Sequence, residues 1–407
     1  MRILLLVHQY PPDYIGGTEL YTQTLAEALA RRGHQVTVLC RGATPGVGLQ
    51  QAEENGVVVW RAPASTSMNR RFLSTFGDAP ARSAFEHVLS QTNPDWVHIQ
   101  HLIGFPVGVL RSIRERGIPF AITLHDYWWV CANAQLLTNY SGQLCAGPHA
   151  YLNCARCVLA RAGLGGLWPA VPPVAWPLSW RGSQLRAALR QASRVIAPSA
   201  FVQAWYNAHC IPEKRIEVLP HGLEWPSGLR RSRSPSEPVR LLYLGGLAWQ
   251  KGVHVLLEAF GRVSGAAELW IAGNETLDPA YVERLRALAS SQVRFLGPLN
   301  QGRRWEVLSQ VDVLTVPSLW HETFSLVTHE AFAAGVPVVA SRVGALSEAV
   351  QDRANGLLLP PGDVSVWQAA LQRLVQEPGL IEEMRANVRP PMTLDAHVQR
   401  LESLLRS

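Results

Sequence analysis

Two glutamates and one lysine are the residues best suited to hold a charged ligand that also carries hydroxyl groups. Glu322 lies in a predicted loop, and Glu330 lies about one turn into the helix that follows. A loop carboxylate can accept hydrogen bonds from hydroxyl groups, and the free N–H groups of a helix start favour phosphate. Lys251 follows a Gly245-Gly246 turn, where an ammonium group can neutralise a diphosphate. An ordinary surface lysine and first-turn glutamates are the alternatives.

Further polar groups lie where predicted strands end. Gly16-Gly17 separates the first strand from a helix, and glycine there lets the backbone approach an anion closely. His125 and Asp126 end the apolar run Phe120–Leu124, which indicates polar contacts or proton transfer at a ligand site. A simple turn, a packed histidine and a helix-capping aspartate are the alternatives. The chain lacks the spaced glycines of dinucleotide-binding proteins.

Four of the six cysteines form a cluster in the sequence, at Cys131, Cys145, Cys154 and Cys157. The last two form a Cys-x2-Cys pair, a spacing that suits one tetrahedral zinc ion. Such a zinc would be structural, because four thiolates leave no open coordination position. Unligated buried thiols and disulfides are the alternatives.

The cysteine cluster belongs to a segment, 127–180, that departs from the rest of the chain. Its only charged residues are Arg156 and Arg161, and it holds five of the 14 tryptophans. A surface for peripheral membrane contact and a packed loop both fit this composition. Four prolines predict that no long helix runs through its second half, namely Pro169, Pro172, Pro173 and Pro177.

Strand-like runs alternate with helical patterns along the chain. Predicted strands of the first half are 2–7, 36–39, 57–60, 96–99, 120–124 and 195–197, with helices near 20–29 and 107–116. Predicted strands of the second half are 241–244, 269–272, 293–296, 313–316, 336–340 and 357–359, with helices at 252–260, 280–289, 326–334 and from 364 onward. The α/β alternation predicts a doubly wound parallel sheet in each half.

These elements predict two domains. The first is 1–223, with 127–180 as an insertion, and a linker follows at 224–238. The second domain is 239–385, and 386–407 is a helix that would pack back on the first. Ligands of open α/β sheets bind beyond the carboxyl ends of the strands, so a cleft between the domains is the expected site.

Composition limits the classes of protein that fit. The formal charge of +6 over 407 residues is modest and does not indicate nucleic-acid binding. The apolar run at the N-terminus is shorter than a signal peptide requires, and the chain has no uninterrupted apolar stretch of transmembrane length. These features predict a cytoplasmic protein, with peripheral attachment to the inner face of the plasma membrane as an option.

The motifs, taken in order, resemble retaining glycosyltransferases of family 4, a part of glycosyltransferase group 1. They are the Gly-Gly-x-Glu turn at 16–19, the strand-end His125-Asp126, the Gly-x-Leu-x3-Lys-Gly turn at 245–252 and the Glu-x7-Glu element at 322–330. Ser199 and Pro220-His221-Gly222 fit the same pattern. The resemblance covers nearly the whole chain. It implies the GT-B fold, in which two Rossmann-like domains face a central cleft.

The resemblance also implies a role for each motif residue. Glu330 would hold the ribose of a UDP- or GDP-sugar, and Lys251 would hold its diphosphate, with no metal in catalysis. His125 would contact the donor sugar, and Glu322 would lie beside the anomeric centre or the sugar hydroxyls. The backbone around the phosphates and sugar would come from Phe324, Ser325, Leu326, Gly16 and Gly17.

Two residues depart from the family pattern. Gly246 stands where the family usually has an arginine, and Arg303, Arg304 and Arg342 are candidates to replace that cation. His221 stands where asparagine is usual. The expected activity is transfer of a hexose-type sugar to a glycan or lipid-linked acceptor, in assembly of a surface polysaccharide or glycolipid. A sugar-nucleotide epimerase and a catalytically silent sugar-nucleotide-binding protein are the alternatives.

Overall fold

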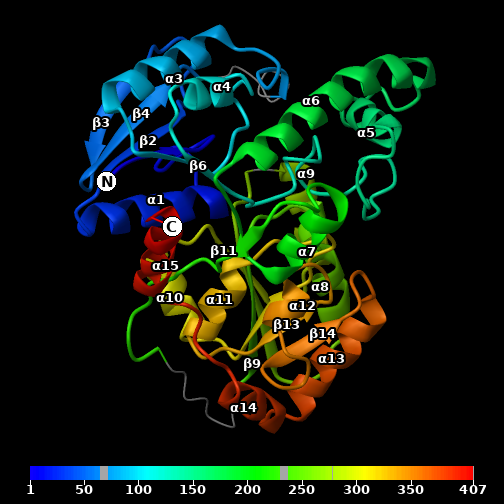
Figure 1. Ribbon diagram of the computed structural model, residues 1–407. Helices are drawn as coiled ribbons and strands as arrows, with labels where there is room; N and C mark the ends of the chain where they lie inside the picture. The colour runs from blue at the N-terminus through cyan, green and yellow to red at the C-terminus, as the bar shows by residue number, and fades with distance from the viewer. Residues whose placement is uncertain (65–71, 230–236, 277, 407) are drawn as a thin grey trace. The chain divides into compact units, whose positions relative to one another are not determined.

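The computed structural model describes residues 1–64, 72–229, 237–276 and 278–406, and the chain divides into two compact units (Figure 1). The first unit is Met1–His221 together with the C-terminal residues from Leu394, and the second is Gly222–Thr393. Residues 230–236 of the predicted linker lie outside the described residues. The C-terminal helix begins at Leu394, later than the expected 386.

The first unit is built on an eight-stranded sheet in the order β3-β4-β2-β1-β5-β6-β7-β8. Its strands are β1 (Arg2–Leu6), β2 (Gln35–Arg41), β3 (Gln50–Glu54), β4 (Val57–Ala62), β5 (Trp96–Ile99), β6 (Phe120–Thr123), β7 (Arg194–Ala197) and β8 (Ile216–Val218). All neighbours pair in parallel except β3, which runs antiparallel to β4. Parallel strands joined through helices form the doubly wound sheet that the alternating pattern predicts.

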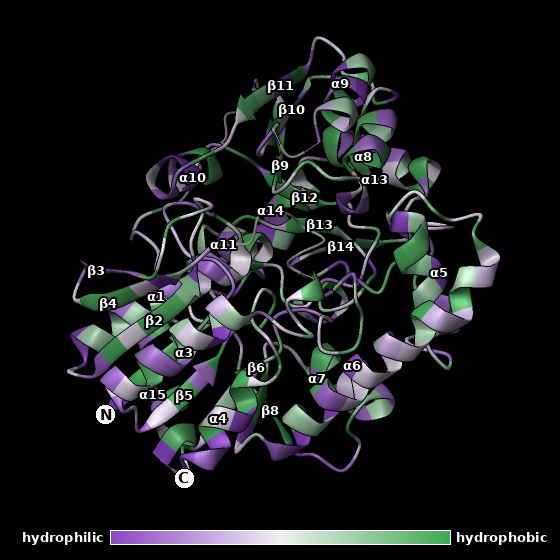
Figure 2. Ribbon diagram, turned by 90° about the horizontal axis from the view of Figure 1, so that it is seen from above, coloured by the Kyte–Doolittle hydropathy of each residue, from purple (hydrophilic) through white to green (hydrophobic). Residues whose placement is uncertain are grey.

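Helices cover the sheet of the first unit. They are α1 (Gly17–Arg31), α3 (Ala79–Thr92), α4 (Val109–Glu115), α5 (Leu152–Arg161), the short η1 (Trp168–Ala170), α6 (Val171–Gln191), α7 (Ala200–His209) and α15 (Leu394–Arg406). In Figure 2, β2 and β4 are largely green, whereas α3 alternates purple with green. Strand β2 is buried beyond its first residue and half of the residues of β4 are buried, while α3 turns one apolar face toward the sheet.

Helix α6 corrects the prediction that prolines exclude a long helix from 164–180. It runs over 21 residues from Val171, and Pro177 lies inside it. Pro172 and Pro173 occupy the first turn, where a missing N–H costs nothing because no intrahelical acceptor exists there. Pro177 removes one interior hydrogen bond. Buried side chains of α5 and α6 pack together in a small core of their own, which offsets that loss.

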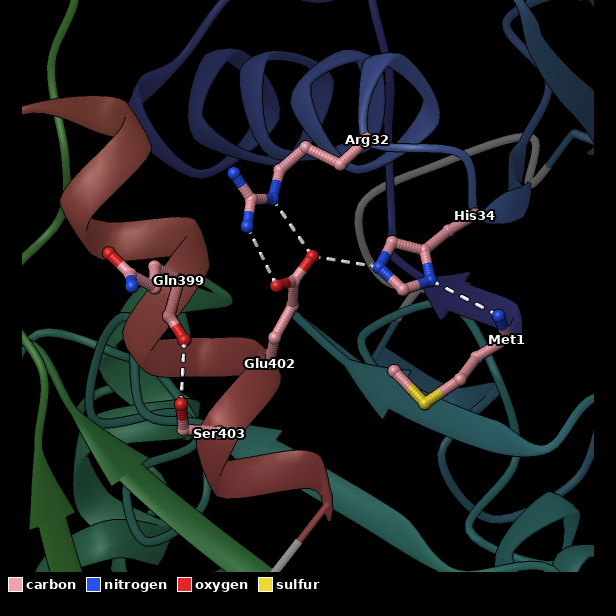
Figure 3. Close-up of polar contacts among 6 residues, drawn as sticks. All are labelled: Met1, Arg32, His34, Gln399, Glu402 and Ser403. Carbon is pink, nitrogen blue, oxygen red and sulfur yellow. Dashed lines mark hydrogen bonds and ion pairs between the residues drawn. The ribbon is translucent and has the colours of Figure 1, made fainter.

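The last helix closes the first unit. Glu402 of α15 accepts hydrogen bonds from Arg32 at 2.9 and 3.0 Å, and lies 2.8 Å from His34 Nε2 (Figure 3). On the buried side, Leu401 and Leu405 have exposed fractions of 0% and 3%. A paired carboxylate and an apolar face thus fasten α15 to residues that directly follow α1.

The second unit holds a six-stranded, fully parallel sheet in the order β11-β10-β9-β12-β13-β14. Its strands are β9 (Val239–Leu244), β10 (Ala267–Ala272), β11 (Val293–Gly297), β12 (Val313–Val316), β13 (Val338–Ser341) and β14 (Gly356–Leu359). Its helices are η2 (Trp249–Lys251), α8 (Val253–Phe260), α9 (Pro279–Leu288), α10 (Gln301–Leu308), α11 (Leu326–Ala333), α12 (Leu346–Ala349), α13 (Val364–Gln376) and α14 (Gly379–Ala386).

Strand β9 shows why the second unit has a core on each face of its sheet. Leu241 and Tyr243 belong to one apolar cluster, and Leu242 and Leu244 to the other. Successive side chains of a strand point to opposite faces, so a sheet covered on both sides needs apolar residues at every position. Among the described helices, none is long and apolar enough to cross a bilayer.

Candidate active site

The second unit brings Lys251 and Glu322 together at the carboxyl ends of two neighbouring strands. Lys251 ends η2, which follows β9, and Glu322 lies in the loop after β12. The Lys251 ammonium lies 2.8 Å from Glu322 Oε1 and 4.9 Å from the ring centre of Trp320. Its side chain is 28% exposed, so the cation reaches solvent while its partner is buried. This is the end of the sheet at which open α/β folds bind ligands.

Three donors hold one oxygen of the Glu322 carboxylate. Besides Lys251, Ser318 Oγ donates to Oε1 at 2.6 Å and Trp320 Nε1 donates at 2.9 Å. Burial by itself would raise the pKa of Glu322, but the Lys251 charge and the three hydrogen bonds outweigh burial and lower that pKa. Glu322 is therefore a fixed anion at neutral pH.

Gly252 allows the two loops to approach this closely. It has a φ of +70°, and a Cβ on it would lie 1.9 Å from the carbonyl oxygen of Pro317. Both the left-handed backbone and the missing side chain are needed. Gly252 therefore brings the end of η2 next to the β12 loop that carries Glu322.

Glu330 pairs with an arginine inside the second unit. Arg304 of α10 donates to Glu330 Oε1, while Oε2 is buried and has no hydrogen-bond partner in the described structure. Burial raises the pKa of Glu330, and Arg304 lowers it only in part, so the pKa stays above its usual value. A buried oxygen without a partner is costly, and a ligand hydroxyl would relieve that cost.

The start of α11 provides backbone donors beside these carboxylates. Ser325 precedes Leu326, the first helical residue, with a φ of +64°, an uncommon conformation for a residue other than glycine. The buried ring of Phe324 stacks on His329 with ring centres 3.9 Å apart. First-turn N–H groups of a helix have no intrahelical acceptor, so this end of α11 can receive an anion.

Only one of the three arginines suggested as replacements for the missing cation contacts a predicted donor residue. Arg304 contacts Glu330, whereas Arg303 pairs with Glu306 on the surface. Arg342 pairs with Asp352 at 3.2 Å. Arg304 is thus already committed to a carboxylate, which suits positioning of Glu330 better than binding of a diphosphate.

In the first unit, histidines follow three neighbouring strands of the sheet. His8 comes after β1, His101 after β5 and His125 after β6. His8 Nε2 lies 3.0 Å from Glu19 Oε1, and His101 Nε2 lies 3.0 Å from Asp126 Oδ2. Burial would raise the pKa of each carboxyl, but its histidine partner outweighs that effect and lowers the pKa below the usual value. The carboxyl ends of these strands thus carry two anchored carboxylates.

His125 is a neutral side chain. Its Nε2 donates to Gln100 Oε1 at 2.7 Å, and burial lowers its pKa to about 3. An imidazole with so low a pKa offers hydrogen bonds but does not accept a proton at neutral pH. Of the two roles expected for His125, the geometry favours polar contact over proton transfer.

A hydrogen-bonded chain behind His125 links α1 to α15. His397 Nδ1 donates to the carbonyl of Pro220 at 2.7 Å, so its Nε2 accepts from the Tyr21 hydroxyl at 2.9 Å. The Tyr21 ring lies 5.0 Å from that of His125 and 4.0 Å from that of His221. His221, which replaces the usual asparagine, therefore packs beside His125 and Tyr21.

The Gly16-Gly17 turn lies where the sequence placed it, at the start of α1. Gly17 is the first helical residue, and a Cβ on Gly16 would lie 2.5 Å from Glu19 Oε2. The missing side chain thus leaves room for the carboxylate that contacts His8. The four clustered cysteines lie elsewhere in this unit and line one small cavity.

Sequence reasoning missed several of these polar groups. It did not single out His8, His101 or Tyr21, nor Ser318 and Trp320 around Glu322. The two histidines could have been predicted from the sequence, because each lies within two residues of the end of an apolar strand-like run. The two donors to Glu322 had no such signal, because their contact depends on the path of a loop.

Comparison with solved structures identifies the fold. Sucrose-phosphate synthase from Thermosynechococcus elongatus aligns over 99% of this chain and 98% of its own, with a TM-score of 0.77 and 20% identity. HepE from Anabaena, in complex with UDP and glucose, aligns over all of both chains with a TM-score of 0.68 and 18% identity. The fold is therefore GT-B, with two Rossmann-like parallel-sheet domains, as expected.

Sequence comparison identifies the family. Residues 15–224 match Glycosyltransferase Family 4, and residues 238–377 match Glycosyl transferases group 1. Glycogen synthase from Mycobacterium tuberculosis is 30% identical over 97% of this chain and 91% of its own length. D-inositol 3-phosphate glycosyltransferase from Xylanimonas cellulosilytica is 26% identical over 95% of this chain and 91% of its own length. The chain belongs to glycosyltransferase family 4 and is a glycosyltransferase, which confirms the resemblance.

Proposed function

We propose that this enzyme transfers a hexose from a nucleoside-diphosphate sugar to a glycan or lipid-linked acceptor, with retention of configuration. The observation that carries the proposal is the group of Lys251, Glu322 and Glu330 at one end of the second sheet. It combines a reachable cation, a fixed anion and a carboxylate oxygen without a partner. A nucleotide sugar needs these groups for its diphosphate, its sugar and its ribose.

Each group has a role in donor binding. Glu330 Oε2 accepts ribose hydroxyls, with Arg304 holding the carboxylate in place. Lys251 and the first-turn amides of α11 face the diphosphate. Solved relatives bind related ligands, since HepE was crystallised with UDP-glucose and Starch Synthase IV from Arabidopsis thaliana with ADP and acarbose. UDP is therefore the first nucleotide to test, ahead of GDP and ADP.

The chemistry follows from the charges that develop during transfer. Cleavage of the glycosyl–phosphate bond leaves negative charge on the diphosphate and positive charge on the sugar ring. Lys251 and fixed N–H groups stabilise the negative charge on the diphosphate, and the Glu322 anion stabilises the positive charge on the sugar ring. His125, held neutral by burial, offers hydrogen bonds to a sugar hydroxyl without adding charge.

Glu322 is better suited to electrostatic support than to covalent catalysis. The three donors on Oε1 and the Lys251 charge lower the pKa of Glu322, and a less basic carboxylate is a weaker nucleophile. Retention then follows from attack on the face that the diphosphate leaves, with a phosphate oxygen taking the acceptor proton. This front-face route needs no glycosyl–enzyme intermediate.

Calorimetry with the purified enzyme tests donor binding. Titrations with UDP, GDP, ADP and their glucose conjugates should identify one nucleotide that binds, and Glu330→Ala should weaken it about tenfold or more. Glu306→Gln is the matched control, because Glu306 is an exposed glutamate of α10 paired only with Arg303 in the described structure. Unchanged affinity in Glu330→Ala would refute the ribose role.

Turnover separates the proposal from its two alternatives. Incubation of the bound donor with acceptor extracts should release nucleotide only when an acceptor is present. A changed sugar nucleotide without acceptor would identify an epimerase. Donor binding with no release across glycan and lipid-linked acceptors would identify a silent binding protein.

An exposed surface of the first unit favours a lipid-linked acceptor. Trp176 is 76% exposed on α6 and Trp168 is 55% exposed in η1, where Arg156 lies 4.1 Å from its ring centre. No Asp or Glu occurs between positions 127 and 212, whereas six arginines do. Exposed aromatic rings in a segment with an excess of positive charge suit the headgroup region of an anionic membrane. The enzyme then acts at the cytoplasmic face of the membrane.

Vesicle sedimentation tests this surface. The enzyme should bind vesicles of phosphatidylglycerol more than those of phosphatidylcholine, and Trp168→Ala combined with Trp176→Ala should reduce binding severalfold. Trp249→Ala is the control, because Trp249 is also exposed but lies in the second unit. Equal sedimentation of all variants would point to a soluble glycan acceptor instead.

A further inference from the structure

We propose that Cys131, Cys145, Cys154 and Cys157 bind one structural zinc ion that fastens the α5–α6 insertion to the first unit. The site is independent of the donor residues, and its role is to hold the fold of the insertion. The four thiols line one cavity, N–H donors face two of their sulfur atoms, and a buried arginine lies within electrostatic range of the cluster.

All four thiols line one cavity although they come from three parts of the chain. Cys131 follows the loop after β6, Cys145 follows the Leu137–Leu144 bridge, and Cys154 and Cys157 lie three residues apart on one face of α5. The cavity measures about 20 Å³, room for one ion or one water molecule. Its lining contains no carboxylate. A soft, sulfur-only ligand set of four is the set that zinc prefers in structural sites.

Hydrogen-bond donors face the sulfur atoms, as they do around bound thiolates. Cys157 Sγ accepts from Asn133 Nδ2 at 2.9 Å and from the Asn139 amide at 3.2 Å. Cys145 Sγ accepts from the Gly147 amide at 3.4 Å and from Asn153 Nδ2 at 3.6 Å. The sulfur atoms of Cys145 and Cys157 also donate to the carbonyls of Gly147 and Leu137, as protonated thiols do. The facing N–H groups would stabilise these sulfur atoms as thiolates once zinc displaces their protons.

Three backbone amides lie near the Cys131 sulfur atom, those of Asn133, Gln135 and Leu136. Together with the donors to Cys145 and Cys157, they would stabilise and orient the thiolates of a zinc-bound cluster.

A buried arginine provides the countercharge. Arg181 of α6 is 2% exposed, and it donates through one nitrogen to the carbonyl of Trp128 at 2.9 Å. Its Nε has no hydrogen-bond partner in the described structure, and Cys131 and Cys154 are within electrostatic range. Asp126 lies within electrostatic range as well, and the guanidinium lies 4.5 Å from the ring centre of Trp128, so this charge is compensated in part. Zinc displaces four protons to solvent, and the resulting tetrathiolate centre carries a double negative charge that Arg181 partly balances.

The thiols do not hold an ion as they are placed. Within the described ranges, no group of three or more His, Cys, Asp or Glu side chains could hold a metal ion. Zinc binding therefore requires the cysteine side chains to turn toward the cavity that they line. All six cysteines are free thiols, so no disulfide prevents this rearrangement, and structural zinc binding supplies free energy that can drive it.

Metal analysis of the full-length enzyme tests the site. Protein purified from zinc-supplemented cells without chelators should contain about one zinc ion per chain. Cys154→Ser should lose the metal, whereas Cys210→Ser should keep it, because Cys210 is a buried cysteine outside the cluster. Zinc content below one tenth per chain, or intact disulfides among the four cysteines by mass spectrometry, would overturn the proposal.

Two measurements cover the case in which Cys154→Ser does not fold. Reduced wild-type enzyme refolded with cobalt should show thiolate-to-cobalt charge-transfer absorption, and its absence would count against the site. Alkylation of native enzyme should label the four cysteines only after chelation, and labelling without chelator would also overturn the proposal. None of these readouts depends on donor binding or turnover, so they are distinguishable from failure of the proposed function.

Discussion

At the scale of single residues, the pair of Arg304 and Glu330 sets a pH dependence that can be measured. Burial raises the pKa of Glu330, and Arg304 opposes that rise. Arg304→Ala should therefore raise this pKa further, so that the carboxylate protonates at a higher pH and loses an acceptor. We expect nucleotide affinity near pH 6 to fall about tenfold, with recovery as pH rises.

The control for that pH profile is the adjacent arginine. The Arg303 side chain is 57% exposed and contacts Glu306. Arg303→Ala should therefore leave the pH dependence of nucleotide affinity unchanged. Calorimetry between pH 5 and pH 8 on wild type and both variants gives the three curves. Coincident curves for Arg304→Ala and wild type would mean that Glu330 does not titrate in donor binding.

Lys251 carries the largest expected effect on turnover. Lys251→Met keeps the apolar length of the side chain but leaves the buried Glu322 without its cation and the diphosphate without its point charge. Loss of preorganised charge stabilisation should lower kcat about 100- to 1000-fold. Nucleotide release in a coupled assay measures it. Lys214→Met is the control, since Lys214 donates to main-chain carbonyls of the first unit, and an equal loss there would indicate a general folding defect.

The sequence predicts the donor residues better than it predicts their partners. The positions of Lys251, Glu322 and Glu330 after strands and near a helix start follow from local patterns in the sequence, and their roles in binding the sugar donor stay predictions. The Lys251–Glu322 contact could not, because it depends on the left-handed Gly252 beside Pro317. The same holds for Arg304, whose neighbour Arg303 is identical in type but points to the surface.

At the scale of elements, the close packing of α5 on α6 depends on one glycine. A Cβ on Gly182 would lie 1.7 Å from the Tyr151 hydroxyl, which also accepts from Arg186 at 3.0 Å. Gly182→Ala should displace the buried Tyr151 ring and loosen α5. We expect faster amide hydrogen exchange over 152–161 and destabilisation of about 1–3 kcal/mol. Ser183→Ala is the matched control on the exposed side of α6, and equal exchange in both variants would contradict the close packing.

Elements were predictable where apolar periodicity is strong and less so where single residues decide. The buried strands β1, β2 and β9 follow from their apolar runs, whereas β3 is polar and was missed. Its only signal is Asn55-Gly56, whose φ values of 53° and 78° fit the turn that closes a two-residue hairpin. For α6, position within the helix decides what each proline costs, so the prediction that four prolines exclude a long helix was wrong.

At the scale of the whole molecule, the first unit contains both ends of the chain. Helix α15 contributes His397 to the chain that reaches Pro220, and Glu402 to the contacts with Arg32 and His34. The unit is thus complete only after the last residues are made. A return of the C-terminal helix to the first domain was expected, but its partners involve residues over 350 positions apart in sequence, which no local pattern specifies.

The contact of Glu402 with Arg32 makes the stability of the first unit sensitive to acid. The hydrogen bond from Arg32 is the main cause that lowers the pKa of Glu402 to about 2, from an ordinary 4.5. Because the folded-state pKa is the lower one, the stabilisation is complete above pH 4.5 and is lost as pH falls toward 2. Glu402→Gln should therefore lower Tm by about 2–4 °C at pH 7, and the difference from wild type should vanish near pH 2. Glu115→Gln is the control, because its pair with Arg111 is exposed and should add little. Calorimetric scans across this pH range would contradict the role of Glu402 if the two variants behaved alike.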